Sequence, residues 1–174
     1  LMTRGQNCGN CGFSDADYRP KAHQLPPEAL LKQRYLVASV LGEGGFGITY
    51  LAKDSLDRNV VIKECFPSSF CRRSKTVVAA RSRAHTAELR SVVQLFVREA
   101  RNLAKIVHPN IVAVHQVFED NFTAYMAIDF IDGRDLHDIL DSTDQAFTPD
   151  QIVTMLRLFL ADSSNEARVI DTVD

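Results

Sequence analysis

The sequence lacks an excess of charge of either sign, because 20 lysine and arginine residues stand against 22 aspartate and glutamate residues, for a net charge of -2. A nearly neutral chain has no global field that attracts nucleic acid or an anionic membrane, so charge predicts neither partner. No apolar run reaches the roughly 20 residues that span a bilayer, and the first residues contain no apolar signal-peptide core. These absences favour a globular cytoplasmic protein.

Cysteine is also scarce, with four residues in the chain. Cys8 and Cys11 have the spacing of half a tetrahedral zinc site. No second cysteine pair follows, and His23 is the one further nitrogen ligand nearby, so two interpretations stay open: a flexible head with two free thiols, or an incomplete or shared zinc site. Cys65 and Cys71 are expected to be ordinary reduced thiols.

The chain divides by composition into three parts. Residues 1–28 form a head without helical or strand periodicity, which ends in the stiff linker Leu25-Pro26-Pro27. Residues 29–131 alternate as strands do around one helical stretch, and residues 132–174 begin with helical patterns that end after Ala161. The sequence therefore predicts an α+β fold, with an antiparallel five-stranded sheet and one long helix followed by an incomplete helical part.

Strands are predicted on both sides of a glycine-rich loop, at 59–63, at 111–118 and at 123–131, with a turn at 119–121. The connector from 65 to 90 carries a basic cluster that we expect to be a solvated surface, with a docking or regulatory patch as the minority alternative; it comprises Arg72, Arg73, Lys75, Arg81 and Arg83.

The long helix is predicted from an apolar stripe that ends before His108-Pro109, because proline disfavours helix at the preceding residue. The stripe comprises Val92, Phe96, Leu103 and Ile106, and Glu99 lies on the same face. A carboxylate on an apolar stripe needs a partner, since its unpaired burial is costly. A short helix is expected at 135–140, and another from Thr148-Pro149, with a capping box.

The glycine-rich loop is Gly42-Glu43-Gly44-Gly45-Phe46-Gly47, and an apolar strand that ends in Lys63 follows it. Glycines let the backbone approach phosphates closely and tolerate the positive φ of a tight hairpin. A lysine on a rigid strand supplies a point charge for the same phosphates. A glycine loop alone is a weak signal, but with a lysine at this spacing it predicts a nucleotide clamp.

Residues 25–160 resemble the bacterial type of serine/threonine protein kinase, over its N-lobe, its hinge and the first helices of its C-lobe. Five segments in the family's order carry the resemblance: 41–50, Val61-Ile62-Lys63-Glu64, Phe96-Val97-Arg98-Glu99-Ala100, His108-Pro109-Asn110-Ile111-Val112, and 123–133.

The resemblance implies that ATP with magnesium is the cofactor and that Lys63 binds the α- and β-phosphates, with Glu99 as its ion-pair partner. The loop residues Gly42, Glu43, Gly44, Gly45, Phe46 and Gly47 would cover the phosphates. Ile128 would be the gatekeeper, Asp129 to Ile131 the hinge, and Leu41, Thr49 and Val61 would surround the adenine.

The 174 residues contain no His-Arg-Asp and no Asp-Phe-Gly. In this family those motifs supply the catalytic base and the magnesium ligands, so this chain alone is expected to be inactive. Three hypotheses follow: the front part of a transferase that phosphorylates proteins, a catalytically dead pseudokinase-like module that binds nucleotide or a partner, and a zinc-dependent interaction element at the head.

Overall fold

The computed structural model describes residues 19–133, 139 and 147–160. The chain forms two compact units. The first unit contains the residues up to Lys105 together with Val114–Phe130, and the second contains Ile106–Ala113 and the residues from Ile131 onward.

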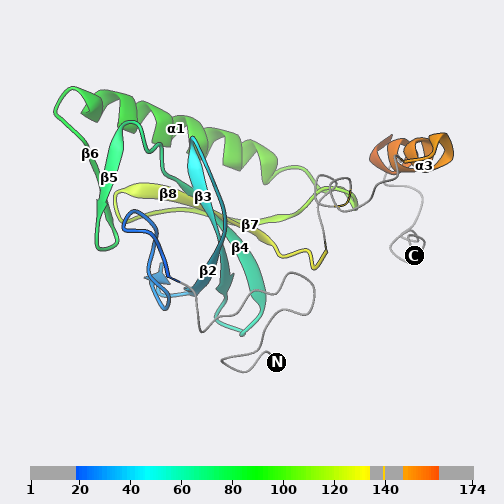
Figure 1. Cartoon of the computed structure of the whole chain (residues 1–174), viewed down its shortest axis with the longest axis horizontal. Coiled ribbons are helices and arrows are strands. Elements are labelled where there is room, and N and C mark those ends of the chain that lie inside the picture. Colours follow the sequence, from blue (N-terminus) through cyan, green and yellow to red (C-terminus); the bar gives the residue numbers. More distant parts are fainter. Residues whose placement is uncertain (1–18, 134–138, 140–146, 161–174) are drawn as a thin grey trace. The chain divides into compact units, whose positions relative to one another are not determined.

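The first unit is built on an antiparallel six-stranded sheet in the order β1-β2-β3-β4-β8-β7 (Figure 1). Its strands are Leu30–Leu31 (β1), Tyr35–Gly44 (β2), Gly47–Lys53 (β3), Asn59–Cys65 (β4), Val114–Asp120 (β7) and Thr123–Asp129 (β8). The five long strands confirm the predicted sheet. β1 adds a sixth strand that is too short to show an alternating pattern in the sequence.

The connector after β4 is more ordered than the sequence predicted. It contains a two-stranded hairpin, in which Cys71–Ser74 (β5) pairs with Val77–Ala80 (β6). Figure 1 shows this hairpin beside the first turns of helix α1, His85–Leu103. The basic cluster thus lies on a folded hairpin and on the segment that leads into the helix.

Helix α1 covers one face of the sheet. Its residue Val97 packs with Cys65 of β4 and Ala124 of β8. The helix ends at Leu103, earlier than the predicted end just before His108, and Leu103 is 45% exposed. Its buried residues are Leu89, Val97 and Ala100. The buried face is therefore displaced from the predicted stripe, and Glu99 at its flank is exposed.

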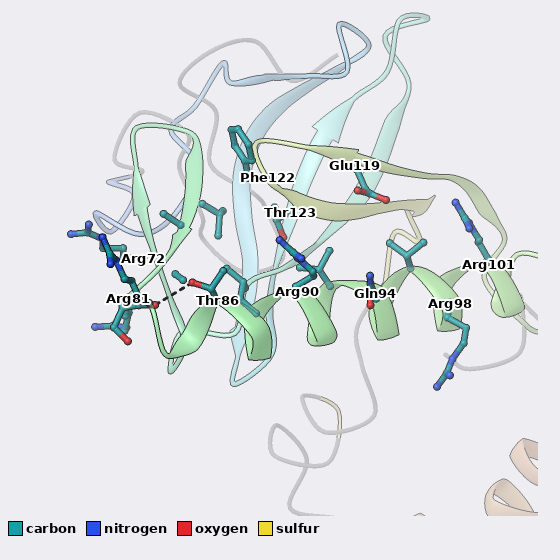
Figure 2. A pocket seen from close by; sticks show the side chains of 18 of the residues that line it. Arg72, Arg81, Thr86, Arg90, Gln94, Arg98, Arg101, Glu119, Phe122 and Thr123 are labelled. Atoms are coloured by element: carbon teal, nitrogen blue, oxygen red, sulfur yellow. Dashed lines mark hydrogen bonds between the residues drawn. The ribbon is translucent and has the colours of Figure 1, made fainter.

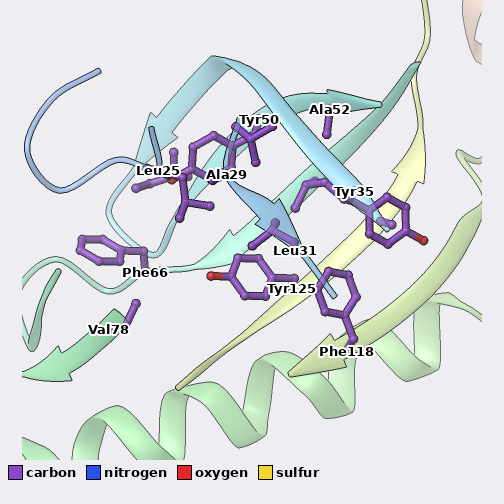
Figure 3. Close-up of a cluster of buried hydrophobic side chains, with 14 of the residues drawn as sticks. Leu25, Ala29, Leu31, Tyr35, Tyr50, Ala52, Phe66, Val78, Phe118 and Tyr125 are labelled. Atoms are coloured by element: carbon purple, nitrogen blue, oxygen red, sulfur yellow. Dashed lines mark hydrogen bonds between the residues drawn. The ribbon is translucent and has the colours of Figure 1, made fainter. Parts of the chain in front are cut away.

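The opposite face of the sheet holds the main hydrophobic core, which is rich in tyrosine (Figure 3). Phe118 of β7 stacks between Tyr35 and Tyr125, with ring centroids 5.5 and 5.3 Å apart. The segment before β1 completes this core: Leu25 is fully buried and its backbone N–H donates to the hydroxyl of Tyr50 at 3.1 Å. Leu25, interpreted as part of a stiff linker, therefore packs in the core, whereas Pro26 and Pro27 are exposed.

The hairpin between β7 and β8 turns at Asn121 and Phe122, which have φ angles of 49° and 60°. Two consecutive left-handed residues are typical of a type I′ turn, which matches the twist of antiparallel strands. Glu119 and Asp120, which we expected in the turn, are the last residues of β7.

Helix α3, Pro149–Leu160, belongs to the second unit. The predicted capping box is confirmed, because the backbone N–H of Gln151 donates to Oγ1 of Thr148 at 3.3 Å and Oε1 of Gln151 accepts from the N–H of Thr148 at 2.8 Å. The helix expected at 135–140 falls almost entirely outside the described residues. Across the described part of the chain, none of the helices combines the length and apolarity that a bilayer crossing requires.

Candidate nucleotide-binding site

The strand register brings four of the predicted site residues onto one face of the sheet. Lys63 in β4 lies opposite Thr49 in β3, and Val61 lies opposite Ile128 in β8. Residues directly opposite each other on neighbouring strands project to the same side, and residues two apart on one strand do so as well. Thr49, Val61, Lys63 and Ile128 therefore share a face.

This face is the one on which α1 packs, because Cys65 follows Lys63 by two residues and contacts the helix cluster. Toward Val61 the face is open. Lys63 is exposed, and Thr49, Val61 and Ile128 are partly exposed. In contrast, the neighbours Ile62 and Glu64, which project to the other side, have 0% and 1% of their surface exposed. Polar and apolar groups are thus available side by side on this face.

The glycine-rich loop is a tight hairpin between β2 and β3. Gly44 and Gly47 are its last paired residues, so Gly45 and Phe46 form the tip. Phe46 is 76% exposed, and its backbone carbonyl accepts a hydrogen bond of 3.1 Å from the N–H of Phe66. Leu41 lies at a bulge at the base of the hairpin and is half exposed.

The glycines of the hairpin serve two different purposes. A Cβ on Gly47 would lie 2.3 Å from the carbonyl oxygen of Glu64, so the packing of β3 on β4 requires a glycine there. A Cβ on Gly42, Gly44 or Gly45 would meet nothing within 4 Å. None of the four has a left-handed φ, contrary to the expectation that the turn needs one. Packing within the protein therefore does not explain why positions 42, 44 and 45 are glycine.

The predicted ion pair between Lys63 and Glu99 is not formed in this structure, among the residues it describes. Both side chains are exposed. The two elements that carry them meet, since α1 packs on the face of β4 from which Lys63 projects. The pairing of Lys63 with Glu99 stays a prediction.

Glu43, inside the glycine hairpin, is held by the segment before β1. Its Oε1 lies 2.6 Å from Nε2 of His23, while Oε2 accepts from Gln24 at 2.9 Å and from Lys21 at 3.3 Å. Partial burial opposes ionisation of Glu43, but hydrogen bonds from Gln24, His23 and Lys21 outweigh it and lower its pKa. We call these four residues the Glu43 clamp. The sequence contains no local signal for it, because its two halves are 20 residues apart.

The predicted hinge begins where β8 ends. The carboxylate of Asp129 lies 2.6 Å from Nε2 of His115 in β7, so the start of the hinge is tied to the neighbouring strand. The sequence did not predict a role for His115, because only the pairing of β7 with β8 brings it next to Asp129. Ile131 belongs to the second unit.

Behind Lys63, on the core side of β4, Glu64 forms a buried ion pair with Arg73 of the β5–β6 hairpin at 2.5 Å. Both side chains have no exposed surface. The hydroxyls of Tyr50 and Tyr125 each donate to Glu64 at 2.8 Å. Burial, reinforced by the Glu64 charge, raises the pKa of both tyrosines, so they remain donors.

Arg73 also donates to the backbone carbonyls of His23 and Thr76, at 2.7 and 2.8 Å, and lies over the ring of Phe66. Because every charge in this network has partners, its burial is compensated. The expectation that the whole basic cluster is solvated is wrong for Arg73.

The zinc hypothesis gains no support. Cys8 and Cys11 lie outside the described residues, and within the described ones no three histidine, cysteine or acidic side chains gather as metal ligands. His23, the third ligand considered, is engaged by Glu43 and stacks on Phe66 with ring centroids 5.9 Å apart. Cys65 and Cys71 are free thiols, as expected, and are buried.

Comparison with known proteins extends the assignment. The protein kinase domain model matches residues 35–161, which is more than half of the chain. The serine/threonine-protein kinase PksC of Streptomyces coelicolor is 35% identical over 118 residues, which cover 65% of this chain and 18% of PksC. PknB of Mycobacterium leprae is 32% identical over 136 residues, which cover 75% of this chain and 19% of PknB. The chain thus spans about a fifth of the length of these relatives.

Solved structures agree. The structure titled "PpkA-294 apo form" matches with a TM-score of 0.65 and 32% identity, over 69% of this chain and 43% of that one. The kinase domain of Mycobacterium tuberculosis PknI matches with a TM-score of 0.57 and 21% identity, over 78% of this chain and 48% of that one, and shows the fold alone. The chain belongs to the protein kinase family, in the part that the bacterial serine/threonine kinases share with it.

Proposed function

We propose that this chain is the ATP-binding portion of a serine/threonine protein kinase. The observation that carries the proposal is the register of β3, β4 and β8, which gathers Thr49, Val61, Lys63 and Ile128 on one open face beside the glycine hairpin. An exposed cation next to apolar surface suits a ligand that combines phosphates with a flat base.

The glycine hairpin supports the same ligand. Gly42, Gly44 and Gly45 have free space where a Cβ would be, so another molecule could approach their backbone closely. In the proposed complex their backbone N–H groups bind phosphate oxygens, and Lys63 neutralises the phosphate charge. Glu99 then approaches Lys63 and orients its ammonium group, as the protein-kinase arrangement requires.

The adenine is proposed to lie against Val61, Leu41 and Thr49, with Ile128 as gatekeeper and the backbone of Asp129 to Ile131 as hinge. The Glu43 clamp supports this geometry, because it anchors one strand of the hairpin from outside. Magnesium accompanies ATP in this family, but the described residues contain no cluster of three potential ligands for it, so no magnesium ligand is assigned.

A thermal-shift titration of the 174-residue chain with ATP and magnesium tests the proposal. At 100 times its dissociation constant a ligand adds about 2.7 kcal/mol of stability, which in a domain of this size raises Tm by about 5 to 10 °C. Lys63→Met should abolish the shift, whereas the exposed control Lys32→Met should keep it. Gly44→Ala should reduce the shift without lowering the Tm of the free protein. An unchanged shift in Lys63→Met would place the nucleotide elsewhere.

A second candidate is a module that binds nucleotide or a partner without catalysis. It is favoured by one observation, the absence of His-Arg-Asp and Asp-Phe-Gly from the 174 residues. Transfer of labelled phosphate from ATP to casein tests the inactivity that both roles predict for this chain. We expect no transfer above the Lys63→Met background from this chain alone, and clear transfer would contradict the expected inactivity. Phosphorylation of a protein by the full-length kinase and the cytoplasmic location stay predictions.

A further inference from the structure

A second surface feature, a hollow on the first unit, is lined by residues outside the glycine hairpin. It is a groove of about 1070 Å³ between helix α1, the β5–β6 hairpin and the β7–β8 turn (Figure 2). Arg90 lines the groove and precedes Glu99 by nine residues. At about 100° per residue this spacing is two and a half turns of helix, so Arg90 and Glu99 lie on opposite sides of α1. The groove is therefore distinct from the proposed nucleotide site.

The groove concentrates positive charge. Helix α1 contributes Arg90, Arg98 and Arg101 to its lining, and Lys105 follows the helix. The hairpin and the segment after it contribute three further arginines. Glu119 is the single acidic residue in the lining. The whole chain has more acidic than basic residues, so this accumulation does not follow from composition. We call this surface the basic groove.

Two of these cations, Arg90 and Arg101, are available to a ligand. Arg90 and Arg101 are exposed, and within the described part of the chain no carboxylate pairs with either. In Figure 2 Arg101 rises from α1 on the side of strands β7 and β8, whereas Arg98 points away from them. Guanidinium groups bind carboxylates and phosphates in a fork geometry, so an anion that entered the groove would have ready donors.

The groove also offers apolar contacts. Val78, Leu89 and Val97 line it and are almost fully buried, which makes its floor aliphatic. Phe122 stands at its rim with 83% of its surface exposed and a φ of 60°. A type I′ turn favours glycine at this position, and no packing in the described structure explains an exposed phenylalanine there. A partner that covers the ring of Phe122 would explain it.

We propose that the basic groove binds an acidic segment of another protein, one that combines several carboxylates with at least one aliphatic side chain. Charge complementarity favours this occupant, and the aliphatic floor matches it. A nucleic acid strand fits less well, because single-stranded nucleic acid is bound on stacked aromatic side chains and Phe122 is the one aromatic residue in the lining.

Fluorescence anisotropy with the 174-residue chain, in the absence of nucleotide, tests the proposal. The probe is a labelled peptide of alternating glutamate and leucine residues, and the comparison peptide has glutamine in place of glutamate. We expect saturable binding of the glutamate peptide alone. Raising the salt from about 0.1 M to about 1 M should weaken it strongly, since the Debye length falls from about 10 Å to about 3 Å.

Variants locate the binding surface. The double variant Arg90→Gln/Arg101→Gln should raise Kd about tenfold, which corresponds to about 1.4 kcal/mol. The control Arg19→Gln/Arg34→Gln changes the net charge equally, at exposed positions outside the groove, and should keep Kd within about twofold, the scatter expected of surface substitutions. Phe122→Ser should weaken binding at unchanged net charge.

Several results would overturn the proposal: no saturable binding, equal binding of the glutamine peptide, or equal loss in the control variant. Tighter binding of a single-stranded DNA oligonucleotide would assign the groove to nucleic acid instead. A dimer in light scattering that the groove variant dissociates would assign it to a second copy of the chain. Because nucleotide is absent from these measurements, their outcome is independent of the ATP titration.

Discussion

The substitution Gly47→Ala tests whether the glycine hairpin is held by the packing of β3 on β4. The new Cβ would lie 2.3 Å from the carbonyl oxygen of Glu64, whereas ordinary van der Waals contacts of a Cβ begin at 3.4 Å. The obstacle is backbone in a paired strand, so it cannot rotate away as a side chain could. The strands must separate by about 1 Å, and we expect the free energy of unfolding to fall by about 1–3 kcal/mol, as for other overpacked sites.

The matched control is Gly44→Ala, at the other end of the same two-residue turn. Its Cβ would meet nothing within 4 Å, and an alanine restricts the unfolded chain, so stability should stay the same or rise by up to about 1 kcal/mol. Circular dichroism melting measures both variants. The expected Tm of Gly47→Ala is lower by about 2 to 12 °C. Equal melting temperatures in the two variants would refute the steric argument.

Three further predictions concern buried or paired groups. Replacing Arg73 by methionine leaves a buried carboxylate without its cation, so the free energy of unfolding, measured in urea, should fall by about 3–5 kcal/mol. The control Arg72→Met, at an exposed position, should change it by less than about 0.5 kcal/mol. Similar losses in the two variants would show that the buried ion pair contributes little. Burial raises the pKa of Cys65 to about 12 and of Cys71 to about 11, so iodoacetamide at about pH 8 should label both slowly until the chain is unfolded, and rapid labelling of native protein, read by mass spectrometry, would contradict their burial. Hydrogen bonds from Arg58 lower the pKa of Asp54 from 3.8 to about 2. The ionised Asp54 therefore contributes fully to stability above its unfolded pKa, and this contribution is lost as the pH falls toward 2. The stability difference between the unsubstituted protein and Asp54→Asn should shrink below about pH 4, and a difference that grows on acidification would contradict this prediction.

The features that could be predicted from the sequence are those in which neighbours in the chain interact. The Thr148–Gln151 capping box involves four consecutive residues, and the glycine hairpin joins two consecutive strands, so residue type and spacing were sufficient for both. The strands of the main sheet were predictable because alternation reports which face is buried. The position of helix α1 in the sequence was predicted correctly, but its last residue and its buried face were not, because several residues on adjacent faces of the helix are apolar.

Residues far apart in the sequence acquired their roles only in the folded chain. Arg73 looked like part of a solvated cluster, but the return of the β5–β6 hairpin places it against Glu64 in the core. The Glu43 clamp depends on the path of the segment before β1, and the basic groove depends on α1, a hairpin and a turn that meet in space. Local patterns determine which elements form, because they depend on backbone geometry and nearby side chains. Which charges become paired and which stay open to a ligand depends on long-range packing, which no local pattern encodes.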